Sequence, residues 1–182
     1  MALIFTTSYL EDALSLLRYY KKLGDGALAQ VPDDRLTATL GAGMNSIATI
    51  VRHLAGNMLS RWTDFLTSDG EKPSRDRDAE FDNPAISRAE LLMMWDQGWA
   101  CVFGALKPLN EAAMSQTITI RGERHSVMQA VNRQLAHYAY HVGQMALLAK
   151  YYAGDEWKTL SIPRGQSKEF ARRVAKGELS QR

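Results

Sequence analysis

The sequence predicts an all-α protein built as a four-helix bundle. Apolar residues recur with helical spacing in four long segments, and polar stretches that contain proline or glycine separate these segments. The connection between the second and third segments is long, which is typical of a bundle with one extended crossover. With 182 residues, 46% of them hydrophobic, the chain is long enough for one buried core and short for two domains. We therefore expect residues 1–182 to form a single domain.

The first two helices are bounded by local signals. The first is expected from about Thr7 to Ala29, because leucines line one side of it and Pro32 follows. The second is expected over the stretch from Ser46 to Leu66, with Asn45 or Ser46 as its N-cap. The polar stretch 67–85 is rich in Asp, Arg and Pro, so we expect a long surface loop that buries little area.

The second half of the chain predicts two more long helices and a short extended element. A capping box, Ser87-Arg-Ala-Glu90, should open the third helix, which continues to about residue 106. In residues 117–124, threonine and isoleucine, both β-branched, alternate over the first four positions and are followed by Arg-Gly-Glu, which favours a short hairpin or extended arm leading into the fourth helix. Ser126 should cap that helix, and Gly154 should lie just past its end. After an irregular stretch, 157–165, Ser167 should cap a short C-terminal helix that ends near Lys176.

Composition argues against several classes of protein. The apolar runs are too short for a membrane span, and the net charge of +2 with only isolated basic pairs gives no nucleic-acid footprint. The segment Met1–Ser8 has neither a basic leader nor a cleavage-site pattern, and a single cysteine, Cys101, cannot form an internal disulfide. We therefore expect a cytoplasmic protein in which Cys101 is a core residue rather than a reactive thiol.

Three of the four histidines form a pattern that is typical of metal ligands. His137 and His141 lie four residues apart on the expected fourth helix, and positions i and i+4 differ by only about 40° around a helix axis. His53 lies on the second helix, where the apolar stripe meets a polar edge. Three imidazoles can hold zinc, nickel, iron or copper and leave a position open for water or substrate. The alternative is that these histidines are core residues whose ring nitrogens are hydrogen-bonded within the core. This alternative stays open because sequence spacing does not show whether the two helices are neighbours.

Other residues near this pattern allow two interpretations. His125 flanks the Arg-Gly-Glu turn and is expected to be hydrated or to help cap the fourth helix. A metalloprotease is excluded, because Tyr138 stands where the His-Glu-x-x-His motif needs its glutamate. Four residues close in angle to the histidines can orient a ligand or substrate, or else hydrogen-bond to a metal ligand or within the core, the second role being favoured for the last two: Asn57, Gln134, Tyr138 and Gln144. Three arginines are candidate anchors for a carboxylate, or else solvated surface residues: Arg61, Arg124 and Arg133.

Several segments together carry a resemblance to a known family. Residues 46–62, Ile120-Arg-Gly-Glu123, 132–144 and the tail 157–170 resemble the DinB/YfiT-like superfamily of metalloenzymes, and within it a branch of small uncharacterised bacterial proteins. The resemblance covers nearly the whole chain. It implies an up-down-down-up four-helix bundle, commonly a homodimer, with a divalent metal held by a histidine triad. Matched position by position, the triad is His53, His137 and His141, with no departure at any of the three.

The resemblance also implies a class of reaction. Relatives in the superfamily include thiol-dependent transferases and a thiol-dependent maleylpyruvate isomerase, so we expect zinc or nickel, or else iron or manganese, to activate a low-molecular-weight thiol for transfer to an electrophile. Metal-bound water would instead give a hydrolase, and a third alternative is a non-catalytic, metal-binding, stress-related dimer. The expected partners are a small-molecule substrate or thiol and a second copy of the chain. The dimer contact is expected to use aromatic residues in excess of the needs of one core: Trp62, Trp95, Trp99, Tyr151 and Tyr152.

Overall fold

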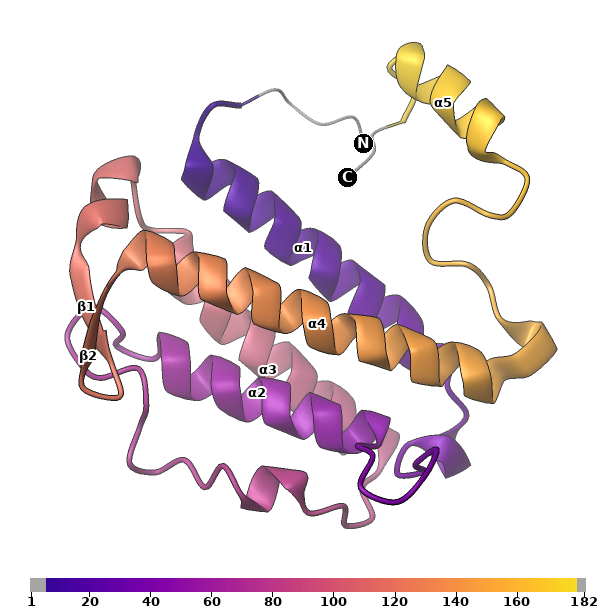
Figure 1. Ribbon diagram of the computed structural model, residues 1–182, viewed down its shortest axis with the longest axis horizontal. Helices are drawn as coiled ribbons and strands as arrows, with labels where there is room; N and C mark the ends of the chain where they lie inside the picture. The colour runs from indigo at the N-terminus through magenta and orange to yellow at the C-terminus, as the bar shows by residue number, and fades with distance from the viewer. Residues whose placement is uncertain (1–5, 180–182) are drawn as a thin grey trace.

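The computed structural model describes residues 6–179, so the first five residues of the segment Met1–Ser8 lie outside the described residues. Four long helices dominate this part of the chain (Figure 1): α1 (Tyr9–Leu28), α2 (Ile47–Trp62), α3 (Arg88–Leu106) and α4 (Val127–Ala153). In Figure 1, α1 and α4 run in one direction and α2 and α3 in the opposite direction. The predicted all-α fold is therefore confirmed, and its helices follow the up-down-down-up order.

Helix packing is closest between α2 and α3 and between α1 and α4, and α2 also contacts α4. At the α2–α3 contact, a Cβ on Gly98 would lie 2.9 Å from the Met58 sulfur and 3.1 Å from the Cα of Ala55. The lack of a side chain at Gly98 therefore lets these two helices approach one another. None of the helices in residues 6–179 is both long enough and apolar enough to cross a membrane.

Serine N-caps set the starts of the long helices. The hydroxyls of Ser8 and Ser46 accept hydrogen bonds from the first turns of α1 and α2, while Ser87 and Ser126 form complete capping boxes. The cap of α2 is thus Ser46, one of the two residues predicted.

Two predicted boundaries were wrong by a few residues. The second helix ends at Trp62 rather than near residue 66, because Thr63 is extended, with a ψ of 122°, and Asp64 then adopts a positive φ of 47°, neither of which a right-handed helix contains. Ser167 is the first residue of α5 (Ser167–Ala175) and not its cap, since Gln166 precedes it without a side-chain capping bond. The predicted end near Lys176 is confirmed.

A short hairpin precedes α4, as predicted. Strand β1 (Thr117–Ile120) pairs antiparallel with β2 (Glu123–Ser126), with residue 117 opposite residue 126. The two turn residues, Arg121 and Gly122, both have positive φ, which suits the right-handed twist of a two-residue hairpin. The carboxylate of Asp69 accepts hydrogen bonds from both of their backbone N–H groups and ties the hairpin to the long loop.

The aromatic residues expected at a dimer contact lie mostly inside the bundle. Trp62, Trp95 and Trp99 are at most 2% exposed, and the Trp99 ring packs edge-on against Tyr138 of α4 at 5.4 Å between centroids. The expected excess of aromatic surface is therefore wrong for the three tryptophans, because large rings fill the space between α3 and α4. Cys101 is partly buried and packs against this core, in line with its predicted role.

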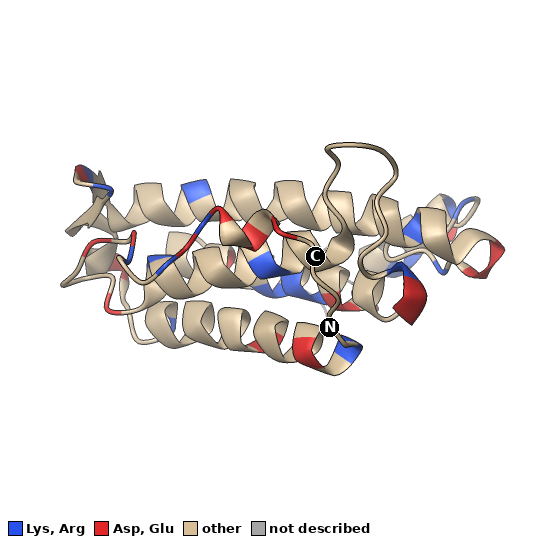
Figure 2. Ribbon diagram, turned by 90° about the horizontal axis from the view of Figure 1, so that it is seen from below, with Lys and Arg blue, Asp and Glu red and all other residues tan. Residues whose placement is uncertain are grey.

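The loop between α2 and α3 lies mostly at the surface, as predicted, but it buries two charged side chains. It crosses the bundle in front of the helices in Figure 2 and carries acidic and basic residues along its length. A 3-10 turn, Ala79–Phe81, brings Glu80 against α2 with only 8% exposure. Gly56 leaves the room for it, since a Cβ at that position would overlap the Glu80 carboxylate. The loop departs from the prediction at Arg75 and Glu80, because their ion pair lets it bury both charged side chains.

Candidate metal centre

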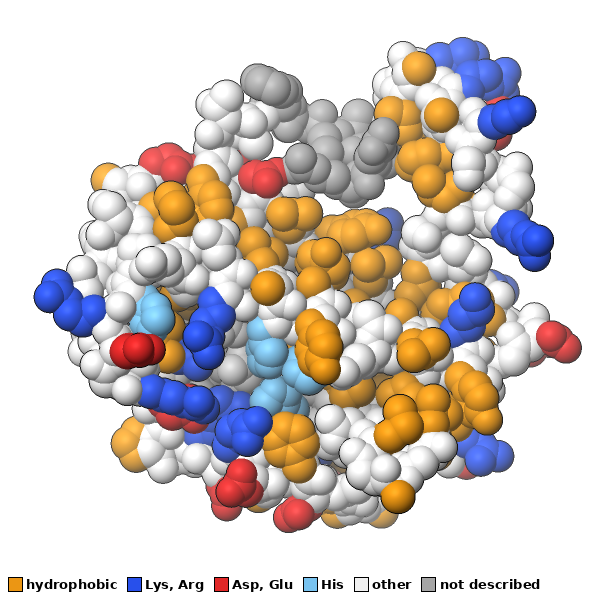
Figure 3. Space-filling model, in the orientation of Figure 1, with side chains coloured by type: hydrophobic (Ala, Val, Ile, Leu, Met, Phe, Trp, Pro, Cys, Tyr) orange, Lys and Arg blue, Asp and Glu red, His pale blue; other side chains and the backbone are white. Residues whose placement is uncertain are grey.

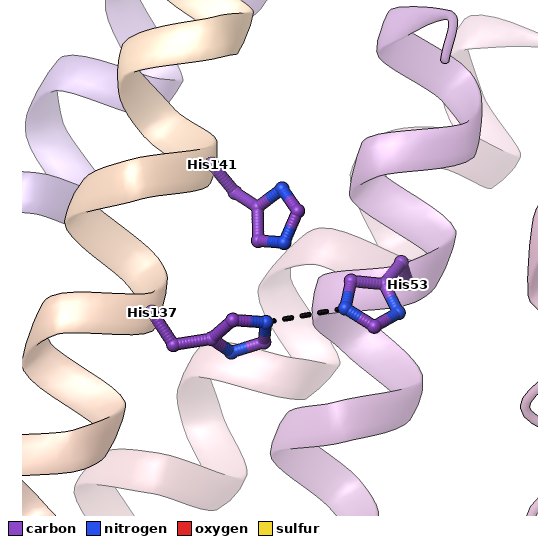
Figure 4. A group of neighbouring side chains, drawn as sticks. All are labelled: His53, His137 and His141. Atoms are coloured by element: carbon purple, nitrogen blue, oxygen red, sulfur yellow. Dashed lines mark hydrogen bonds between the residues drawn. The ribbon is translucent and has the colours of Figure 1, made fainter. Parts of the chain in front are cut away.

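Three histidines from two helices converge between α2 and α4 (Figure 4). His53 projects from α2 and His137 and His141 from α4, with ring centroids between 4.7 and 5.2 Å apart. One possible ligand nitrogen of each residue lies within 4.8 Å of the others. The Nε2 atoms of His53 and His137 are 3.2 Å apart. Two nitrogens bound to one tetrahedral zinc ion are about 3.3 Å apart, so this distance fits two ligands of a single ion.

Helices α2 and α4 are in contact, which the spacing of the histidines in the sequence could not show. The three predicted histidines are neighbours in space, so this cluster of described residues could hold a divalent metal. The fourth histidine, His125, lies on β2 opposite Ile118, and its Nε2 is 3.7 Å from a carboxylate oxygen of Glu123. As predicted, it is not part of the cluster.

Glu80 fixes the orientation of His53. The Nδ1 atom of His53 lies 2.9 Å from Oε2 of Glu80, so an Nδ1–H group donates to the carboxylate and the Nε2 lone pair faces the other histidines. Arg75 donates two hydrogen bonds to the same carboxylate, at 2.7 and 2.8 Å. Burial alone would raise the pKa of Glu80, but the hydrogen bonds from Arg75 and His53 hold it below its usual value. A carboxylate placed in this way selects the tautomer of a metal-binding histidine and increases its basicity.

The two histidines of α4 are held differently. His141 places Nδ1 2.9 Å from Oε1 of Gln144, one turn further along the helix, which again directs Nε2 toward the cluster. The Nδ1 atom of His137 is buried and has no hydrogen-bond partner. The outer nitrogens of His53 and His141 are therefore held by neighbouring side chains, whereas no side chain among the described residues holds the outer nitrogen of His137.

The electrostatic surroundings favour neutral imidazoles. Burial lowers the pKa of His137 to about 3, and the neighbouring His141 and His53 act in the same direction. Burial also lowers the pKa of His141, against the opposing effect of its hydrogen bond to Gln144. Both rings are therefore unprotonated at neutral pH, which is the form that binds metals.

Aromatic side chains border the cluster. The ring of Phe81 lies 5.0 Å from that of His53, and the ring of Tyr140 lies 4.9 Å from that of His141, measured between centroids. The guanidinium of Arg77 lies over the ring of Phe81, 5.0 Å from its centroid. In Figure 3 the histidine cluster reaches the surface between hydrophobic side chains and a group of Lys and Arg side chains. The site is thus open to solvent on one side and walled by rings.

A family model described as "Protein of unknown function (DUF1572)" matches residues 4–166, which include the whole cluster. The chain belongs to the DUF1572 family. A search of curated proteins finds no match to it.

The remaining candidates of this DUF1572 protein divide into core and site residues. Tyr138 is fully buried, and its hydroxyl accepts a hydrogen bond from Nε1 of Trp62 at 2.9 Å, so it is a core residue, as favoured from the sequence. Gln144 orients His141, also as favoured. Two of the three candidate arginines, Arg124 and Arg133, are exposed, whereas the third is 4% exposed. Two amide residues are buried, each with an unpartnered carbonyl oxygen: Asn57 and Gln134.

Sequence reasoning missed Glu80 and Arg75. Both lie in the long loop, where alternating charges are indistinguishable from a solvated surface. Their pairing depends on a three-dimensional contact with α2, for which the sequence carries no local signal.

Proposed function

We propose that this chain is a divalent-metal-dependent enzyme of the DinB/YfiT-like superfamily that activates a low-molecular-weight thiol for transfer to an electrophile. One observation carries the proposal: three histidines converge, and two of them have their outer nitrogens held by Glu80 and Gln144. Three protein ligands leave at least one coordination position for another molecule, as in catalytic rather than closed structural sites. Imidazole ligands suit zinc or nickel, which we propose as the metals.

The residues around the cluster would have distinct tasks in such a reaction. A bound dication would lower the pKa of a coordinated thiol, so that thiolate is available near neutral pH. Glu80 would keep the Nε2 atom of His53 unprotonated and aimed at the ion. The rings of Phe81 and Tyr140 would limit the access of water to the sulfur while the electrophile enters from the open side.

The arrangement of Glu80 favours a thiol over metal-bound water as the nucleophile. A hydrolase that uses water gains from a free general base beside the metal. Within the described residues, Glu80 is the carboxylate that hydrogen-bonds to the cluster, and both of its oxygens are occupied by Arg75 while one also binds His53. It is therefore poorly placed to take a proton from water. A thiol needs no such base once it is coordinated.

We further propose that the protein acts in the cytoplasm as a homodimer. Three large apolar side chains on α4, namely Tyr140, Leu147 and Tyr151, are 63%, 63% and 66% exposed and fall on one side of the helix. Such a stripe is a candidate self-contact. Sedimentation at micromolar concentration should give a species of twice 20.4 kDa, and a monomer alone would contradict the dimer.

Cobalt substitution tests the proposed chemistry. Adding small thiols to the cobalt protein should produce intense near-ultraviolet charge-transfer bands, more strongly as the pH rises toward neutrality, and these bands should be lost in His137→Ala and His141→Ala. The same protein should consume a thiol in the presence of a generic electrophile. An unchanged spectrum together with hydrolysis of esters or amides would replace the thiol by metal-bound water. An unchanged cobalt spectrum together with no turnover of any substrate would support a metal-binding protein without catalysis.

A further inference from the structure

Arg61 is a buried cation with incomplete pairing. Its side chain is 4% exposed, and its Nε and Nη1 atoms are buried without a hydrogen-bond partner. Its Nη2 atom lies 3.7 Å from a carboxylate oxygen of Glu71, the one acidic side chain in the described residues that pairs with it. Glu71 is shared with Arg75 at 3.4 Å and with Arg121 at 3.3 Å. A buried charge is strongly unfavourable unless it is paired and hydrogen-bonded, so a bound anion would stabilise the Arg61 side chain.

Arg61 lies about two turns after His53 on α2, toward the hairpin end, and about 80° further around the helix axis. His53, Asn57 and Arg61 follow one another in steps of four residues, which places the first and last about 12 Å apart along the axis. The helix α4 runs antiparallel to α2 (Figure 1), so a step toward the C-terminus of α2 corresponds to a step toward the N-terminus of α4. Gln134, one turn before His137, therefore lies at about the level of Asn57.

Unpartnered polar atoms continue from Arg61 to the cluster. They are Oδ1 of Asn57, Oε1 of Gln134 and Nδ1 of His137, all buried. Elsewhere in the described residues, such side-chain atoms occur only in Trp99 and Tyr152. Buried polar atoms normally have partners, and a run of exceptions along one helix contact indicates a ligand that supplies them.

The surrounding charge is positive. Burial lowers the pKa of Arg61, and the charges of Arg121 and Arg133 act in the same direction against the opposing effect of Glu71. Figure 3 shows Lys and Arg side chains gathered between the histidine cluster and the hairpin end of the bundle. A negatively charged group would relieve this mutual repulsion.

We propose that Arg61, Asn57 and Gln134 form a subsite for the anionic end of a small molecule whose other end reaches the histidine cluster. The ligand class is an elongated molecule with a carboxylate or phosphate at one end and a metal-binding group at the other. Between them it carries N–H or O–H donors for the carbonyl oxygens of Asn57 and Gln134. Only the part of this inference that concerns the metal-binding end of the ligand rests on the proposed function. The anionic subsite itself needs no metal.

Titration of the metal-free protein with inorganic phosphate or with succinate, at constant ionic strength set by chloride, tests the subsite. The Arg61 Nε–H resonance, assigned by its loss in Arg61→Lys, should shift with at least one of the two anions. That anion should raise the Tm of the wild type and of the matched exposed variant Arg124→Met. Its affinity for Arg61→Met should be at least about tenfold weaker, because a buried anion without its cation is poorly bound.

The outcomes separate the ligand classes and the two proposals. A response to succinate alone supports a carboxylate end, and a response to phosphate alone supports a phosphate end. An Arg61 resonance that moves with neither anion, or equal stabilisation of Arg61→Met and the wild type, would overturn the subsite. Because the resonance is measured in the wild type, the test survives if Arg61→Met does not fold. Absence of metal binding with an intact anion response would defeat the proposed function and leave the subsite standing.

Discussion

Replacing Glu80 by glutamine tests how the long loop supports the histidine cluster. The carboxylate accepts one hydrogen bond from His53 at 2.9 Å and two from Arg75 at 2.7 and 2.8 Å. A carboxamide has one acceptor oxygen, so it cannot satisfy all three donors, and its NH₂ group would face a donor. We expect Glu80→Gln to leave His53 free to rotate and to change tautomer.

The size of the effect follows from these contacts. Loss of the group that orients a metal-binding histidine costs roughly 10- to 100-fold in metal affinity, or about 1.4 to 2.7 kcal/mol. The same change leaves Arg75 buried, and breaking a buried ion pair costs about 3 to 5 kcal/mol. The lower end applies, since Glu71 still lies 3.4 Å from Arg75. At about 2–4 °C per kcal/mol for a chain of this length, the Tm should fall by roughly 6–12 °C.

Competition against a chromogenic zinc chelator, beside thermal unfolding of the metal-free protein, measures both effects. Glu71→Gln is the matched control, because Glu71 also pairs with Arg75 but makes no contact with a histidine. Its zinc affinity should stay within about twofold of the wild type. If Glu80→Gln lowers the Tm as expected but binds zinc as tightly as the control, Glu80 stabilises the loop alone and the reasoning about His53 is refuted.

Three further predictions concern stability. Between pH 6.5 and 3 the unfolded chain protonates His137, which the folded protein keeps neutral, so the free energy of unfolding of the metal-free protein should fall by up to about 1.4 kcal/mol per pH unit as the pH falls. This contribution should be absent in His137→Ala. Denaturant unfolding of both proteins over this pH range measures it, and an equal slope in the two would refute it. Gly98→Ala should destabilise the protein by about 1–3 kcal/mol, because the added methyl group overlaps α2. Gly104→Ala lies on the same helix but meets open space, so it should stabilise the protein by up to about 1 kcal/mol. Equal stabilities of the two variants in calorimetry would contradict the close approach of the helices. Tyr138→Phe should destabilise the protein by about 1–3 kcal/mol, because the Trp62 N–H loses its acceptor, while the metal content stays the same. Loss of metal in this variant would show that Tyr138 takes part in the metal site.

Much of the fold was predictable because its signals are local. Serine caps and capping boxes mark helix starts within a few residues, and the β-branched run before Arg121 and Gly122 marks the hairpin. The boundary errors came from backbone conformation, since nothing in the sequence requires a positive φ at Asp64. The histidine triad was predictable as a pattern, but its convergence depended on contact between α2 and α4.

The rest could not be read from the sequence because it depends on partners far along the chain. Glu80 meets His53 across 27 residues, through a loop whose charges resemble those of any solvated segment. Tryptophans on amphipathic helices suit a core or an interface equally well, and only their burial inside the bundle assigns Trp62, Trp95 and Trp99 to the core. Likewise, Arg61 could be told from Arg124 only by its burial.

Metal analysis of protein purified without an affinity tag tests the central claim, that His53, His137 and His141 act together as one metal site. The wild type and His125→Ala should each hold about one divalent ion per chain, and alanine at any of the three clustered histidines should sharply reduce it, because two imidazoles hold an ion less tightly than three. The helical circular dichroism should survive chelation, since the four-helix core does not depend on the ion. Equal metal content in all four alanine variants, or no metal in the wild type after incubation with zinc and with nickel, would contradict the assignment.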